Sequence, residues 1–225
     1  LSCLVGSEMC IRDSIKNICK AENVDIKKIS PKFILAIIDK WKNKGFYPQD
    51  VILKRKDPLE KNFLSIYKIY QEKLVNLNSA DFSDLILHTV KIFEKYTDIA
   101  ELYSKKFKYI LVDEYQDTNF IQSEWLRHLS DRNKNICCVG DDDQSIYSWR
   151  GAEIKNSLTF DKIYKNCKVF KLEQNYRSTK NILDTASNLI SNNSNRVGKK
   201  LWSSANQGEL VKLNCYRTGK EEAQG

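Results

Sequence analysis

The sequence predicts an α/β fold in which an all-helical segment precedes a mainly parallel β-sheet. Two short apolar runs, residues 109–112 and 136–140, are typical of strands that are buried on both faces, and acidic residues directly follow each run. Amphipathic helical patterns precede the first run and separate the two, and strands that alternate with helices indicate a parallel sheet. A length of 225 residues is sufficient for one or two domains with a sizeable core.

Three helices are predicted between residue 14 and about residue 94. Ser30-Pro31 combines an N-cap residue with proline at the first helical position. Asp57-Pro58 begins the second helix, and Asp81 is expected to cap the third. Each helix has an apolar face: Ile34, Ile37, Ile38 and Trp41 in the first, Phe63, Ile66, Tyr67, Tyr70 and Leu74 in the second, and Phe82, Leu85, Ile86 and Phe93 in the third.

The rest of the chain alternates between predicted strands and helices. Residues 168–172 are predicted as a further strand, and residues 211–215 as a strand with one solvated face. Ser178 is expected to cap a helix that residues 192–195 end. Two more apolar faces at helical spacing support this order: Ile121, Trp125, Leu126 and Leu129 between the two central strands, and Ile182, Leu183, Ala186, Leu189 and Ile190 after Ser178.

The composition indicates a basic, intracellular type of protein. The net charge is +8, and residues 15–68 hold thirteen Lys and Arg against six acidic residues. Such a segment suits a polyanion, although a solvated lysine-rich surface explains the same pattern.

Seven cysteines without a CxxC pair and only two histidines argue against a zinc site. Cys137 and Cys138 are expected to pack in a buried strand, reduced thiols indicate the cytoplasm, and no apolar run suits a transmembrane helix.

The acidic residues after the two central strands predict a site for a nucleotide and a metal ion. Asp113 and Glu114 end the first strand, and residues 141–144 follow the second. Ligands of open parallel sheets bind at the carboxyl ends of the strands. Two neighbouring carboxylates suit Mg²⁺, because one can hold the cation while the other acts as a base on its bound water. A salt-bridged surface is the alternative, and the second acidic strand end weakens it.

Three longer motifs occur in order along the chain: VDEYQDTN at 112–119, VGDDDQSIYSWRGA at 139–152 and LEQNYRST at 172–179. They resemble motifs II, III and IV of the UvrD/PcrA/Rep family of superfamily 1 DNA helicases. The resemblance extends from about residue 14 to the C-terminus. It implies a RecA-like ATP-binding domain 1A, a helical insertion 1B that lies over the duplex junction, and a second RecA-like domain 2A.

The resemblance also implies domain boundaries. Residues 14–86 would form the helical 1B domain, residues 87–172 the C-terminal half of domain 1A, and residues 173–225 the start of domain 2A. Residues 1–13 are similar to a translated sequencing adapter, so we expect this segment to be non-native and the gene to be interrupted upstream.

The family's roles in ATP hydrolysis transfer to matching residues of this chain. By resemblance, Asp113 would bind Mg²⁺, and Glu114 beside it would orient and deprotonate the attacking water. Gln144 would hydrogen-bond the γ-phosphate, Arg177 would act as the arginine finger, and Tyr176 would stack on the adenine. Outside such a motif, Arg177 would be interpreted as a helix-entry arginine paired with an acid.

The second half of motif III predicts a site for DNA. Tyr147 and Trp149 are one residue apart, so in an extended segment both rings project to the same side and can stack on unpaired bases. Alternatively, both rings belong to the core. Arg150 is expected to contact a phosphate or Glu114, and by resemblance Lys199 and Lys200 would face the DNA backbone. The expected partners are single-stranded DNA and a duplex junction.

The chain contains no Gly-x-x-x-x-Gly-Lys-Ser/Thr run, which a P-loop requires. The family places this run upstream, and motifs V and VI downstream. We therefore expect a fragment of an ATP-dependent 3′–5′ DNA helicase of DNA repair or replication restart, which by itself hydrolyses ATP negligibly. The alternatives are an ATPase-inactive single-stranded DNA-binding module, the helicase part of a RecB-like helicase–nuclease, and a plain structural α/β domain.

Overall fold

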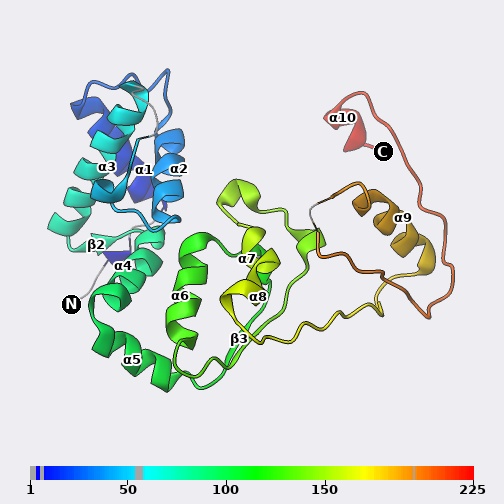
Figure 1. The fold of residues 1–225 in the computed structure, drawn as a ribbon. Helices are drawn as coiled ribbons and strands as arrows, with labels where there is room; N and C mark the ends of the chain where they lie inside the picture. Colours follow the sequence, from blue (N-terminus) through cyan, green and yellow to red (C-terminus); the bar gives the residue numbers. More distant parts are fainter. Residues whose placement is uncertain (1–3, 6–7, 54–57, 195) are drawn as a thin grey trace. The chain divides into compact units, whose positions relative to one another are not determined.

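The computed structural model describes residues 4–5, 8–53, 58–194 and 196–225 (Figure 1). The chain divides into two compact units, Leu1–Ile163 and Tyr164–Gly225. The first unit combines helices with two short pairs of parallel strands. The predicted α/β class with a parallel sheet is confirmed, and the sheet around the two acidic strand ends has two strands among the described residues.

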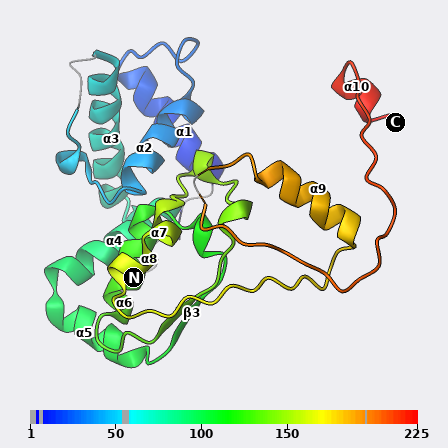
Figure 2. The same cartoon turned by 45° about the vertical axis from the view of Figure 1, so that its right-hand side comes forward.

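Helices α1 (Glu8–Ala21), α2 (Pro31–Lys42) and α3 (Pro58–Asn76) lie side by side and share one core, as Figures 1 and 2 both show. The Ser30 hydroxyl accepts the N–H of Phe33 at 3.2 Å, so the predicted cap of α2 is confirmed. Asp57, the predicted start of α3, lies outside the described residues. The buried core comprises Ile11, Ile15, Ile18, Cys19, Ile34, Ile38, Phe63, Ile66, Tyr67, Tyr70 and Leu74.

Helices α4 (Phe82–Lys95), α5 (Thr97–Lys106) and α6 (Phe120–Ser130) form a second helical group of the same unit. Asp81 caps α4 as predicted, because its carboxylate accepts the N–H of Asp84 at 2.9 Å. The predicted apolar face of α4 is wrong at its start, since Phe82 is 63 % exposed and Leu85 is also exposed. The helix instead turns Asp84, Leu87 and Val90 inward, and Asp84 is ion-paired there with Lys42.

Two pairs of short parallel strands complete the first unit. β1 (Leu4–Val5) pairs with β2 (Ser79–Ala80), and β3 (Ile110–Val112) pairs with β4 (Ile136–Cys138). The prediction that these central strands are buried on both faces is wrong. Leu111 is 81 % exposed and its neighbour Cys137 is exposed too, because alternate side chains point to opposite faces and only one face is covered here. Cys138 on the other face is half-buried, and burial raises its pKa to about 12.

The second unit has little regular structure among its described residues: α9 (Lys180–Ile190), the short helix α10 (Gly219–Glu222), and one parallel bridge between Gln174 and Trp202. The strands predicted at 168–172 and 211–215 are wrong, because an extended segment becomes a strand only when a ladder partner accepts its hydrogen bonds.

The predicted cap of α9 is also wrong, since Thr179 and not Ser178 occupies the N-cap position. Of the predicted apolar face of this helix, Leu183 is buried whereas Ile182 and Leu189 are exposed. Helix α9 ends before residues 192–195, as expected, and Asn195 lies outside the described residues.

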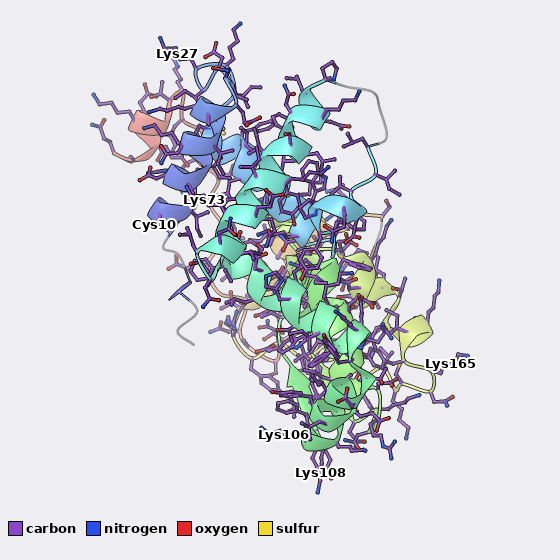
Figure 3. The ribbon with its side chains drawn as sticks, turned by 90° about the vertical axis from the view of Figure 1, so that its left-hand side faces the viewer. Cys10, Lys27, Lys73, Lys106, Lys108 and Lys165 are labelled. Carbon is purple, nitrogen blue, oxygen red and sulfur yellow. The ribbon has the colours of Figure 1, made fainter. Side chains whose placement is uncertain are left out.

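A buried ion cluster joins the two helical groups of the first unit. Lys27, Lys106 and Lys108 point outward (Figure 3), whereas the side chain of Lys42 at the end of α2 is fully buried. Its ammonium lies 2.6 Å from Asp81 and 2.7 Å from Asp84, both at the start of α4. Two side chains of α3 also donate hydrogen bonds to these carboxylates. The Tyr70 hydroxyl donates to Asp81 at 3.1 Å, and the Gln71 amide donates to Asp84 at 3.2 Å.

Asp39, one helical turn before Lys42, makes the stability of this cluster depend on pH. Burial, followed by the charge of Asp81, raises the pKa of Asp39 from 3.8 to about 6. The protonated carboxyl therefore stabilises the fold below about pH 4, and this contribution is lost as the pH rises through about 6.

We expect Asp39→Asn to raise the free energy of unfolding at pH 7 by about 1–2 kcal/mol. The asparagine oxygen can still accept the hydroxyl of Ser83, which lies 3.1 Å from Asp39. Urea unfolding of both proteins between pH 4 and pH 7 measures the difference, which should grow as the pH rises. A constant difference over this range would contradict the assignment to Asp39.

Candidate functional site

The carboxyl ends of β3 and β4 bring the predicted acidic residues together. Asp113 and Glu114 follow β3, and Asp141 follows β4 after Gly140. Glu114 adopts the left-handed conformation with φ 51° and ψ 42°, and the carboxylate of Asp113 accepts its N–H at 2.9 Å. Left-handed residues other than glycine are uncommon and concentrate at functional sites. This turn leaves both carboxylates exposed at the edge of the strand pair.

Gln116 links these acidic strand ends, a role that no pattern in the sequence predicts. Its side chain is 1 % exposed. Its amide nitrogen donates to the carboxylate of Glu114 at 2.7 Å, and its oxygen accepts the N–H of Asp141 at 2.9 Å. Asp141 in turn accepts the side-chain amide of Gln144 at 2.7 Å. A continuous chain of hydrogen bonds therefore connects Glu114 with Gln144, the two residues for which the motifs predict roles at the γ-phosphate.

Close packing at Gly140 leaves no room for a side chain beside Gln116. A Cβ at this glycine would lie 2.7 Å from the side-chain oxygen of Gln116 and 3.3 Å from the backbone nitrogens of Tyr115 and Gln116. The ring of Tyr115 is itself buried and meets Phe160 edge-on at a centroid distance of 5.4 Å. The turn after β3 is thus held from both sides by packing.

The donor set at this edge suits a hard cation that is also bound by phosphate. Carboxylate oxygens are the preferred ligands of Mg²⁺, which commonly takes one or two of them together with the phosphates of a substrate. Asp113 and Glu114 supply such a pair. Across the described ranges, no group of three or more His, Cys, Asp and Glu side chains is arranged to hold a metal ion. These residues fit a Mg²⁺–nucleotide complex better than a closed all-protein metal site.

Tyr147 and Trp149 form an exposed aromatic pair in the same unit. The ring centroids are 6.3 Å apart with 46° between the planes, and Trp149 is 77 % exposed. The alternative that both rings belong to the core is therefore wrong. The expected extended segment is also wrong, because Ser148–Arg150 forms a 3₁₀ turn that Gly151 ends with φ 93°. The side chain of Arg150 lies outside the described part of the chain.

The other predicted site residues belong to the second unit. Tyr176 is exposed, and its hydroxyl donates to Gln174 at 2.8 Å. The carboxamide oxygen of Asn175 accepts the backbone N–H groups of Arg177 and Ser178 at 3.0 and 2.8 Å, so the chain turns sharply at Arg177. The roles of Tyr176 and Arg177 in ATP hydrolysis stay predictions.

Lys199 and Lys200 lie in the segment that runs beside motif IV. The N–H of Lys200 donates to the carboxylate of Glu173 at 3.0 Å. Trp202, two residues after Lys200, forms a parallel β-bridge with Gln174. The side chain of Lys200 is exposed and that of Lys199 is half-buried. Their predicted contact with the DNA backbone is untested.

Known protein families match both parts of the chain. Residues 4–165 match the UvrD/REP helicase N-terminal domain, and residues 170–225 match the UvrD-like helicase C-terminal domain. The chain is 47 % identical over 210 residues to a probable DNA helicase II homolog of Rickettsia conorii, covering 93 % of this chain and 32 % of that protein. It is 45 % identical over 211 residues to the ATP-dependent DNA helicase PcrA of Bacillus subtilis, covering 94 % of this chain and 28 % of PcrA.

The chain thus spans about a third of the length of the curated relatives that it matches. None of the described helices has the length and apolar character that spanning a membrane requires.

Proposed function

Because the chain belongs to the UvrD/REP family of DNA helicases, we propose that it is a portion of an ATP-dependent helicase that moves 3′ to 5′ along single-stranded DNA. The proposal extends to a role in bacterial DNA repair or replication restart in the cytoplasm. One observation carries it: within one unit, the hydrogen-bonded chain from Glu114 to Gln144 leads into the segment that exposes Tyr147 and Trp149. A nucleotide site and a DNA site on one short segment can be coupled.

In the ATP site, we propose that Asp113 and Glu114 hold Mg²⁺ together with the phosphates, and that Glu114 takes the proton of the attacking water. Mg²⁺ would neutralise the charge that develops on the phosphates. The hydrogen bond from Gln116 orients the Glu114 carboxylate, and Gln144 is positioned through Asp141 to sense the γ-phosphate. From the motif resemblance, we also propose Arg177 as the arginine finger and Tyr176 as the adenine contact.

The boundaries at residues 13/14, 86/87 and 172/173 stay part of the proposal. Helix α1 begins at Glu8, before the proposed end of the adapter-derived segment, and α4 extends across residues 86 and 87. Sequencing the source DNA upstream of residue 14 tests the proposed interruption. A P-loop coding sequence in the continuous upstream frame would support it, and a start codon near residue 1 would contradict it.

An ATPase-inactive module for single-stranded DNA is the second candidate. The observation that favours it is the exposed Tyr147–Trp149 pair, whose rings can stack on unpaired bases without a nucleotide. The two candidates share the DNA site and differ in whether Glu114 has a chemical role.

We expect the chain to bind an oligo-dT strand through its exposed aromatic pair. Tyr147→Ala and Trp149→Ala should each lower the affinity by about 5- to 150-fold, since stacking contributes about 1–3 kcal/mol per base. Fluorescence anisotropy of labelled dT₂₀ measures the dissociation constants. Tyr109→Ala removes another exposed ring of the same unit and serves as the matched control. Equal affinities of all four proteins would contradict a DNA site at Tyr147 and Trp149.

A further inference from the structure

The C-terminal end of α2 contacts the segment that follows the acidic turn. Asn43 is the C-cap residue of α2. Its side-chain oxygen accepts the amide of Asn119 at 3.1 Å, and its backbone carbonyl accepts the N–H of Ile121 at 3.1 Å. Asn119 is in turn the N-cap of α6 and directly follows the acidic turn at 113–118. Helix α2 and the turn with Glu114 are therefore linked by polar contacts.

The same asparagine side chain lies against the end of the aromatic segment. Gly151 follows the 3₁₀ turn that contains Trp149, and a Cβ at this glycine would lie 3.6 Å from the side-chain nitrogen of Asn43. The N–H of Ala152 donates to the carbonyl of Tyr147 at 3.2 Å and closes this segment. One side chain at the end of α2 is thus hydrogen-bonded to the residue after the acidic turn and lies near the end of the aromatic segment.

The acidic and aromatic segments are also bonded to each other around Asn43. The N–H of Glu153 donates to the carbonyl of Thr118 at 3.0 Å. The amide of Asn156, which is buried, lies 3.1 Å from the same carbonyl and 3.3 Å from that of Asn119. Buried polar groups that are fully hydrogen-bonded hold a unique arrangement. We call Asn43, Thr118, Asn119, Gly151 and Asn156 the Asn43 joint.

The neighbouring residue holds the joint in place. Lys42 is buried between Asp81 and Asp84, so the last turn of α2 is fastened to the start of α4. Asn43 therefore presents its side chain from a rigid support, as a residue that positions a binding site must.

We propose that Asn43 is a positioning residue that holds the Tyr147–Trp149 pair in its DNA-binding arrangement and connects the helices α1–α3 to the acidic turn. This inference rests on the proposed function for its DNA part. Asn43 touches neither DNA nor nucleotide in this role and acts through Asn119 and Gly151.

The test compares Asn43→Leu, which has a similar volume and no polar group, with Asn43→Asp, which keeps the acceptor for Asn119. In the 225-residue chain, Asn43→Leu should weaken dT₂₀ binding about 3- to 10-fold. This change in affinity corresponds to the net free energy of about one hydrogen bond. Asn43→Asp should rescue the affinity to within about twofold of the wild type. Asn62→Leu, at an exposed position of α3, is the matched control and should have no effect.

Two further measurements separate positioning from general destabilisation. In a Tyr147→Ala/Trp149→Ala background, Asn43→Leu should cause no additional loss of affinity, because its effect passes through the aromatic pair. Without DNA, Asn43→Leu should accelerate amide hydrogen exchange at Gly151 and Ala152 about 3- to 10-fold, while exchange at Tyr67 and Tyr70 in the α3 core stays unchanged.

The outcomes distinguish this inference from the proposed function. If the wild-type chain does not bind dT₂₀, the proposed DNA site fails, and hydrogen exchange alone decides the role of Asn43. Unchanged exchange at Gly151 and Ala152 in Asn43→Leu overturns the inference. An equal loss of affinity with and without the Tyr147–Trp149 pair also overturns it, because Asn43 would then act elsewhere.

Discussion

Lys42→Met is expected to lower the free energy of unfolding by about 3–5 kcal/mol, the typical cost of removing one partner from a buried ion pair. Asp81 and Asp84 are 3 % and 0 % exposed, and Lys42 is within 2.7 Å of both. Without the ammonium, the two buried carboxylates would keep their hydrogen bonds from Tyr70 and Gln71 but lose the positive charge that lies within 2.7 Å of both. The methionine fills a similar volume, so the loss reports the charge.

Urea unfolding, followed by circular dichroism, measures this loss in the 225-residue chain. Lys40→Met changes an exposed lysine of the same helix and should shift the free energy of unfolding by less than about 0.5 kcal/mol. Adding Asp81→Asn and Asp84→Asn to Lys42→Met should recover part of the stability, because the uncompensated charges are removed. A loss below about 1 kcal/mol for Lys42→Met would show that the cluster is less buried than described.

Glu114→Gln is expected to reduce ATP hydrolysis about 10²- to 10⁴-fold in a full-length helicase that contains this segment, the usual contribution of a general base. The glutamine oxygen can still accept the amide of Gln116, so the turn after β3 should keep its shape. Affinity for single-stranded DNA should stay unchanged, because Tyr147 and Trp149 are not altered. Steady-state ATPase assays with Mg²⁺ and oligo-dT measure the effect.

Glu101→Gln is the matched control for this substitution. Glu101 pairs with Lys105 on the surface of α5, and its loss should leave the turnover unchanged. The 225-residue chain alone is expected to show only background turnover, since it has no P-loop run. Turnover by this chain that Glu114→Gln abolishes would contradict that expectation, and equal turnover of wild type and Glu114→Gln in the full-length protein would contradict the role as base.

Several residues that act locally were predictable from the sequence. Ser30 and Asp81 cap α2 and α4 as expected, because a cap is completed within three residues. The apolar faces of α2 and α3 follow from helical periodicity, and the two acidic strand ends meet because parallel strands share one carboxyl edge. Motifs II to IV were sufficient to identify the family.

Features that depend on distant partners were decided only by the tertiary structure. Asp84 turns the start of α4 toward Lys42, 42 positions earlier in the chain, so Phe82 and Leu85 face outward. The strands predicted at 168–172 and 211–215 have alternating or apolar patterns but no ladder partner among the described residues.

The same distinction applies within the candidate site. The sequence alone determined the acidic pair, the aromatic pair and their order along the chain. Only the tertiary structure revealed Gln116 between Glu114 and Asp141, and Asn43 against Asn119, which is 76 residues away. A buried amide needs partners that the fold brings from other segments, and the local sequence around each amide does not specify those partners.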